Sequence, residues 1–106
     1  MLGWRIIRVS GRSMEPDLPS GTYALVRRHP QYKTGDTVLA DHPRYGRIVK
    51  RIVGTEATGF RLAGINPASV SSHDLGALPP DRILGKLVWT VRPPTSSTAS
   101  APQEVS

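Results

Sequence analysis

Short stretches of alternating or continuous apolar residues recur along the chain, and turn-forming residues such as Gly, Pro and Asp lie between them. Runs of this length and composition are typical of β-strands. No segment keeps an apolar period near 3.6 residues, so the one helical turn that we expect is a short one over Leu75–Leu78. The predicted strands span residues 4–10, 22–27, 37–40, 47–53, 59–63 and 83–91.

The first and last predicted strands carry further detail. Because alternate residues of a strand share a face, Ile7 and Val9 point one way, whereas Trp4, Ile6 and Arg8 point the other way. The last strand is interrupted by Gly85, where a bulge is expected.

The composition fits one small domain followed by a tail. With 106 residues, 38% of them hydrophobic, and with ten Gly and ten Pro, the chain suits an all-β domain of short strands. From Pro93 onward the sequence is rich in Pro, Ser and Thr, has a single charge at Glu104, and offers little apolar surface to bury. We therefore expect a folded domain over residues 1–92 and a disordered tail over residues 93–106.

Cysteine and long apolar segments are both absent from the sequence. The lack of cysteine excludes disulfides, thiolate metal sites and a cysteine nucleophile. No apolar run approaches the length of a membrane span, so the expectation is a cytoplasmic protein. The net charge of +6 comes from scattered basic residues, and aromatic residues make up only 6% of the chain. This pattern favours a basic, solvated surface over a nucleic-acid partner.

The most informative segment surrounds Ser13, directly after the first predicted strand. Gly11 permits an unusual backbone conformation just before the serine, and Pro16 imposes a bend just after it. A serine on such a turn presents its hydroxyl and its backbone N–H to one point, as a nucleophile with an oxyanion donor requires. Serine is also common in ordinary turns, so this segment needs a base elsewhere to become a catalytic site.

Lys50 is the best candidate for that base. It shares a strand face with Ile48 and Ile52, so it is the one charged residue on an otherwise apolar face, whereas Arg51 points to the mixed, solvated face. Burial lowers the pKa of a lysine and lets the neutral amine accept a proton. The alternative bases, in a Ser-His-Asp triad, are His29, His42 and His73, all in predicted loops and none positioned by the sequence.

These segments together resemble the Ser-Lys dyad peptidases of the signal peptidase I and LexA-type family. The resemblance implies a coiled, mostly antiparallel and barrel-like β fold with Ser13 as nucleophile and Lys50 as general base. It implies no cofactor and no metal. The matching segments are Val9–Met14 (nucleophile box), Ser20–Val26 (its continuation into a strand), Gly35–Leu39 (Gly-Asp box), Gly46–Gly54 (lysine box), Gly64–Pro67 (Gly-Asp-Asn box) and Leu84–Lys86 (closing strand).

The chain departs from the family pattern at three places. Gly11 stands where signal peptidases often carry a serine that assists the oxyanion hole, so the resemblance assigns more of that role to the Ser13 N–H. Ile65 replaces the usual Asp of the Gly-Asp-Asn box. The family's Asp-Ser-Arg segment is replaced by Ser71–Asp74, with an apparent deletion of one residue. A family serine or threonine there hydrogen-bonds the base lysine, and here Ser71 or Ser72 is expected to do so, the choice between them being open.

The closest resemblance is to the nickel-type superoxide dismutase maturation proteases, which are similar in chain length and in the sequence of Gly64–Ala68. Only 12 residues precede Ser13, so we expect cleavage in trans rather than self-cleavage. The resemblance implies a serine endopeptidase that removes a short N-terminal leader from a precursor bound as an extended strand. Met14 is expected to pack beneath the site. The alternative is a non-catalytic peptide-binding or dimerisation module on the same fold, and the oligomeric state stays open.

Overall fold

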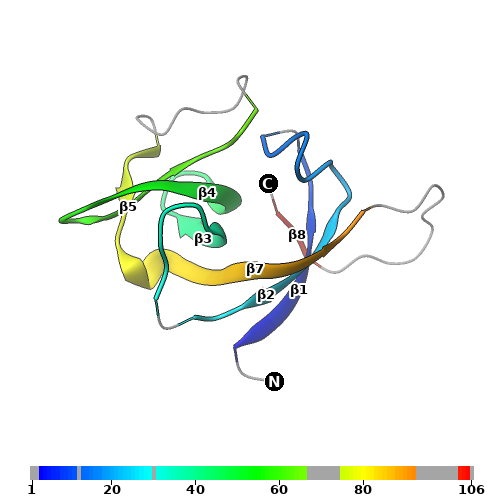
Figure 1. The fold of residues 1–106 in the computed structure, drawn as a ribbon, viewed down its shortest axis with the longest axis horizontal. Helices are drawn as coiled ribbons and strands as arrows, with labels where there is room; N and C mark the ends of the chain where they lie inside the picture. The colour runs from blue at the N-terminus through cyan, green and yellow to red at the C-terminus, as the bar shows by residue number, and fades with distance from the viewer. Residues whose placement is uncertain (1–2, 12, 30, 67–74, 93–102, 106) are drawn as a thin grey trace.

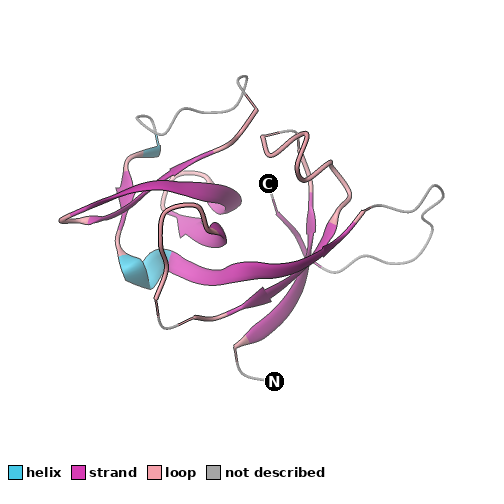
Figure 2. Ribbon diagram, in the orientation of Figure 1, coloured by secondary structure: helices cyan, strands magenta, loops and turns pink. Residues whose placement is uncertain are grey.

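The computed structural model describes residues 3–11, 13–29, 31–66, 75–92 and 103–105, and nearly all regular structure in them is β-strand (Figure 2). One short 3-10 helix, η1, spans Pro80–Arg82. The strands are β1 (Trp4–Val9), β2 (Tyr23–Arg27), β3 (Thr37–His42), β4 (Gly46–Glu56), β5 (Gly59–Ala63), β6 (Ala77–Leu78), β7 (Ile83–Val91) and β8 (Gln103–Val105).

All eight of these strands belong to one sheet, in the order β6-β5-β4-β3-β7-β2-β1-β8. Every pair is antiparallel except β1 with β8, which run parallel. The sheet coils strongly, so that β4 lies across the interior from the loop that follows β1 (Figure 1). The all-β, mostly antiparallel fold predicted from the sequence is therefore confirmed.

Two apolar clusters fill the concave regions of the coiled sheet. Burial of this apolar surface is the main force that holds short strands together. The first cluster joins β1, β2 and the loop between them to β3 and β4, through Ile7, Val9, Met14, Leu18, Ala24, Val26, Leu39 and Val49. The second joins β3, β4 and β5 to residues 75–83, through Val38, Ala40, Ile48, Ile52, Leu62, Leu75, Leu78 and Ile83.

The predicted phase of the first strand is confirmed. Ile7 and Val9 are buried, whereas Trp4 and Ile6 on the other face are exposed. The helical turn expected over Leu75–Leu78 is wrong in its second half, because Ala77–Leu78 forms β6 and pairs with β5. A pairing of two residues depends on a partner brought in by the fold, and it leaves little periodicity in the sequence.

The tail also differs from the expectation of disorder, because Gln103–Val105 forms β8 against β1. The other tail residues, 93–102 and 106, lie outside the described residues. A strand of three residues in a polar segment carries no hydrophobic pattern of its own. It depends on backbone pairing with an exposed strand edge, which composition cannot reveal.

Gly85 lies on β7 close to the end of β2, its neighbour in the sheet. A Cβ atom added there would lie 2.5 Å from Val26 Cγ1 and 3.0 Å from the Arg27 carbonyl oxygen. The pairing of β7 with β3 also shifts next to this residue, between Leu39 and Ala40. Gly85 therefore permits a close approach of two strands, with the expected irregularity beside it.

We expect Gly85→Ala to destabilise the domain by about 1–3 kcal/mol, because the added methyl group overpacks against the stiff Val26 side chain. The measurement is the free energy of unfolding in urea. Gly54→Ala is the matched control, since it also lies in a strand but has no atom within 4 Å of the added Cβ. Equal stability of the two variants would contradict the close approach.

Candidate active site

The loop between β1 and β2 holds Ser13 and is closed at its base by Val9. The Val9 N–H donates to the Thr22 carbonyl oxygen over 2.8 Å, and the Val9 carbonyl oxygen accepts from the Gly21 N–H over 2.6 Å. Gly11 has φ of 88°, a left-handed conformation that glycine adopts without strain. The unusual backbone conformation that the sequence predicts just before Ser13 is thus present at Gly11. After Ser13, the Glu15–Pro16 peptide bond is cis.

Lys50 reaches Ser13 from the middle of β4, 37 positions along the chain. Its Nζ donates a hydrogen bond of 2.7 Å to Ser13 Oγ. Only 5% of Lys50 is exposed, and Ile48 and Ile52, its neighbours on the same face, are buried as well. The apolar face inferred from strand alternation is therefore real, and it brings a lysine and a serine together.

Burial lowers the pKa of the Lys50 ammonium below its ordinary value, because the charged form loses its hydration. The groups that face Lys50 offer little compensation, since Ser13 Oγ is a neutral partner. Asp17 lies in the same loop as Ser13, but its carboxylate pairs with Arg51 at 2.9 Å. A lysine in this environment becomes neutral at lower pH than a solvated lysine, as a general base requires.

The Ser13 loop is held by further contacts that sequence reasoning missed. Arg51 is not simply solvated, because its ion pair with Asp17 ties β4 to the loop beside the Lys50–Ser13 bond. The Asn66 N–H donates to the Ser13 carbonyl oxygen over 2.8 Å. Asp17 and Arg51 lie 34 positions apart, and no local pattern in the sequence marks them as a pair.

Two residues singled out from the sequence pack in or against the first apolar cluster. Met14 is 1% exposed and belongs to the first apolar cluster, so it lies in the core next to Ser13, as expected. Ile65, the residue that departs from the Gly-Asp-Asn box, packs against the same cluster. The apolar side chain at this position therefore adds to the first apolar cluster.

A family model described as Peptidase S24-like matches residues 4–88. The chain belongs to the Peptidase S24-like family. The matched range contains the Ser13 loop, Lys50 and every strand from β1 to β6, together with most of β7. Membership supports a serine-protease type of function, at the level of the family. No curated protein matches the chain.

Of the three histidines considered as alternative bases in this Peptidase S24-like chain, His29 and His42 lie among the described residues. His42 is buried, and its Nδ1 accepts from the backbone N–H groups of Arg44 and Tyr45. Its Nε2 therefore carries the proton and donates to the Leu75 carbonyl oxygen over 2.7 Å. Nδ1 thus holds the turn after β3, Nε2 ties the end of β3 to Leu75, and neither nitrogen bonds Ser13.

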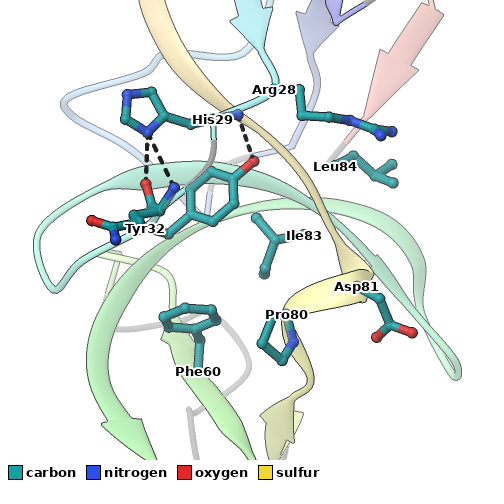
Figure 3. Close-up of a pocket in the computed structure, with 9 residues that line it drawn as sticks. Arg28, His29, Tyr32, Phe60, Pro80, Asp81, Ile83 and Leu84 are labelled. Atoms are coloured by element: carbon teal, nitrogen blue, oxygen red, sulfur yellow. Dashed lines mark hydrogen bonds between the residues drawn. The ribbon is translucent and has the colours of Figure 1, made fainter.

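His29 lines a cavity of about 570 Å³ beside Tyr32 and Phe60 (Figure 3). Its ring turns away from the cavity, and its Nδ1 bonds the Gln31 carbonyl oxygen at 2.7 Å. Neither Ser13 nor Lys50 lines this cavity. His73 and the two serines expected to support Lys50, Ser71 and Ser72, lie outside the described residues.

Other features of the Peptidase S24-like domain bear on what the site can hold. Among the residues that the model describes, no group of three His, Cys, Asp or Glu side chains is placed to bind a metal ion. No helix in the described part of the chain is long and apolar enough to cross a membrane.

Proposed function

We propose that this protein is a serine endopeptidase with Ser13 as nucleophile and Lys50 as general base. The observation that carries the proposal is the 2.7 Å hydrogen bond between Lys50 Nζ and Ser13 Oγ, made by a buried lysine. A serine hydroxyl needs an adjacent base before it can attack a carbonyl, and a desolvated lysine can be that base. Membership in a peptidase family supports the same class of reaction.

The proposed reaction is acyl transfer through Ser13. Neutral Lys50 accepts the hydroxyl proton while Ser13 Oγ attacks the scissile carbonyl carbon. The backbone N–H of Ser13 donates to the developing oxyanion. The Lys50 ammonium then protonates the leaving amine, and the peptide bond breaks to leave an acyl ester on Ser13. Lys50 next deprotonates a water molecule that hydrolyses the ester and restores the hydroxyl.

The proposed substrate is a precursor protein whose short N-terminal leader is removed in trans. Support comes from the resemblance of Gly64–Ala68 to the nickel-type superoxide dismutase maturation proteases. The precursor of a nickel-type superoxide dismutase is therefore the first substrate to assay. An extended leader would bind by backbone pairing to a strand edge near Ser13.

The proposal is tested by incubating the protein with that precursor, and in parallel with a randomised decapeptide library, and by reading cleavage by mass spectrometry. Cleavage of both supports an endopeptidase with this substrate. Cleavage of the library alone keeps the endopeptidase but removes the superoxide dismutase precursor. Peptide binding without cleavage of either favours the alternative, a non-catalytic peptide-binding module.

We expect kcat/KM to rise with pH through the lowered pKa of Lys50, because only the neutral amine can take the serine proton. The measurement is the pH profile of kcat/KM on one cleaved peptide. The profile of Lys33→Met, which alters an exposed lysine, should match that of the wild type. A rising limb that persists in Lys50→Met would assign the base to another group, such as a histidine.

A further inference from the structure

Strand β8 extends the sheet along an edge of β1 that would otherwise be open. The two strands run in the same direction, with Gln103 beside Ile7, Glu104 beside Arg8 and Val105 beside Val9. Hydrogen-bonding groups alternate between the two edges of a strand. Since the Val9 N–H faces β2, where it bonds Thr22, the Arg8 N–H faces the β8 edge.

This edge is close to the candidate dyad. β1 ends at Val9, and the loop with Ser13 follows at once. Cα atoms of β8 also lie within 8 Å of Cα atoms of β4, the strand that supplies Lys50. In the view of Figure 1, β8 lies between β4 and the loop that follows β1.

An extended peptide that binds with its scissile bond at Ser13 needs free backbone groups on a strand near that residue. The β1 edge provides such groups, and in this structure β8 takes them. The parallel direction matters as well, because β8 runs toward the Ser13 end of β1. The acyl part of a substrate laid on the same edge in the same direction would bring its carbonyl end toward Ser13.

We propose that the β1 edge is a strand-binding site for peptides and that Gln103–Val105 occupies it in cis as an internal competitor. This inference rests on the proposed function, because it assigns the edge to the substrate of Ser13 and Lys50. Three paired residues form a short strand that exchanges readily for a longer peptide. Only molecules whose tail is unpaired can bind a peptide at this edge. The tail thus lowers the apparent affinity for peptides in proportion to the fraction of molecules in which it is paired.

The test compares Val105→Pro with Val105→Ala in the full chain. In a parallel ladder the Arg8 carbonyl oxygen accepts from the residue after its partner Glu104, which is Val105. Proline removes that backbone N–H, whereas alanine keeps it. Amide hydrogen exchange is followed at Arg8, which faces β8, with Val9, bonded to Thr22, as the internal control. Fluorescence anisotropy of a labelled synthetic peptide with the sequence of residues 98–106 measures binding to the edge, and the thermal midpoint checks folding.

In Val105→Pro we expect faster exchange at Arg8 but not at Val9, binding of the synthetic peptide that is at least roughly threefold tighter, and a lower KM with unchanged kcat. Val105→Ala should match the wild type. Faster exchange at Arg8 with unchanged peptide affinity and KM would overturn the proposal and leave β8 as a structural cover. Unchanged exchange at Arg8 would overturn the pairing itself. If the peptide binds more tightly but no form of the protein cleaves any substrate, the competitor stands and the proposed peptidase fails.

Discussion

Replacing Lys50 by methionine is expected to lower peptide cleavage by on the order of 10⁴-fold while leaving the domain folded. The methionine keeps most of the apolar volume between Ile48 and Ile52, but it cannot accept the Ser13 proton. Cleavage is measured as kcat/KM on one peptide. The matched control is Lys33→Met, which changes an exposed lysine and should cleave at the wild-type rate.

The same substitution makes a prediction about stability. Burial lowers the pKa of Lys50 in the folded state, so between that pKa and the ordinary lysine pKa the unfolded chain binds more protons. Wild-type stability attributable to Lys50 therefore rises as the pH rises through this window, and the cost of the buried ammonium is fully present below it. Lys50→Met lacks that cost.

We accordingly expect Lys50→Met to be more stable than the wild type at low pH, with a difference that shrinks as the pH rises toward the ordinary lysine pKa. Urea unfolding at a series of pH values measures the difference, and Lys33→Met again serves as the control. A difference independent of pH would contradict a buried lysine with a lowered pKa. Wild-type cleavage by Lys50→Met would remove Lys50 from the mechanism.

Ser13→Ala is the second substitution with a large expected effect. Removal of the nucleophile should lower kcat/KM by on the order of 10⁴-fold or more. It also leaves Lys50 Nζ without its 2.7 Å partner, so we expect a loss of about 1–3 kcal/mol in stability. Ser20→Ala, at an exposed serine of the same loop, is the matched control and should change neither quantity.

The double variant Ser13→Ala/Lys50→Met separates a dyad from two independent residues. Groups that act as a unit lose their contribution once, so the double variant should be no slower than the slower single variant. The measurement is again kcat/KM, with intact peptide binding verified by anisotropy. Losses that multiply, or near wild-type cleavage by Ser13→Ala, would contradict the proposed pair.

Most strands could be predicted because their cause is local. The alternation in residues 4–9 already separates buried Ile7 and Val9 from exposed Ile6, and the structure keeps that phase. Lys50 was accessible to the same reasoning, since its two apolar neighbours on one face mark it as the one charge on that face. Gly11 indicated the left-handed backbone before Ser13 for a similarly local reason.

Contacts between distant segments could not be predicted, because no local pattern encodes a pairing partner. The ion pair of Arg51 with Asp17, the bond from Asn66 to Ser13 and the two-residue strand β6 all depend on which segments the sheet brings together. Strand β8 depends most on the arrangement of the sheet, since a polar tail can pair with β1 only if the open edge of β1 lies within its reach.

The sequence by itself determined an all-β domain, its strand phases and the two residues worth pairing, because these follow from periodicity and residue chemistry. Only the tertiary structure decided that Lys50 Nζ lies 2.7 Å from Ser13 Oγ and that Gln103–Val105 lies along β1. The reason is physical: strand order in a coiled sheet is set by the joint burial of two apolar clusters, and that burial is a property of the whole chain.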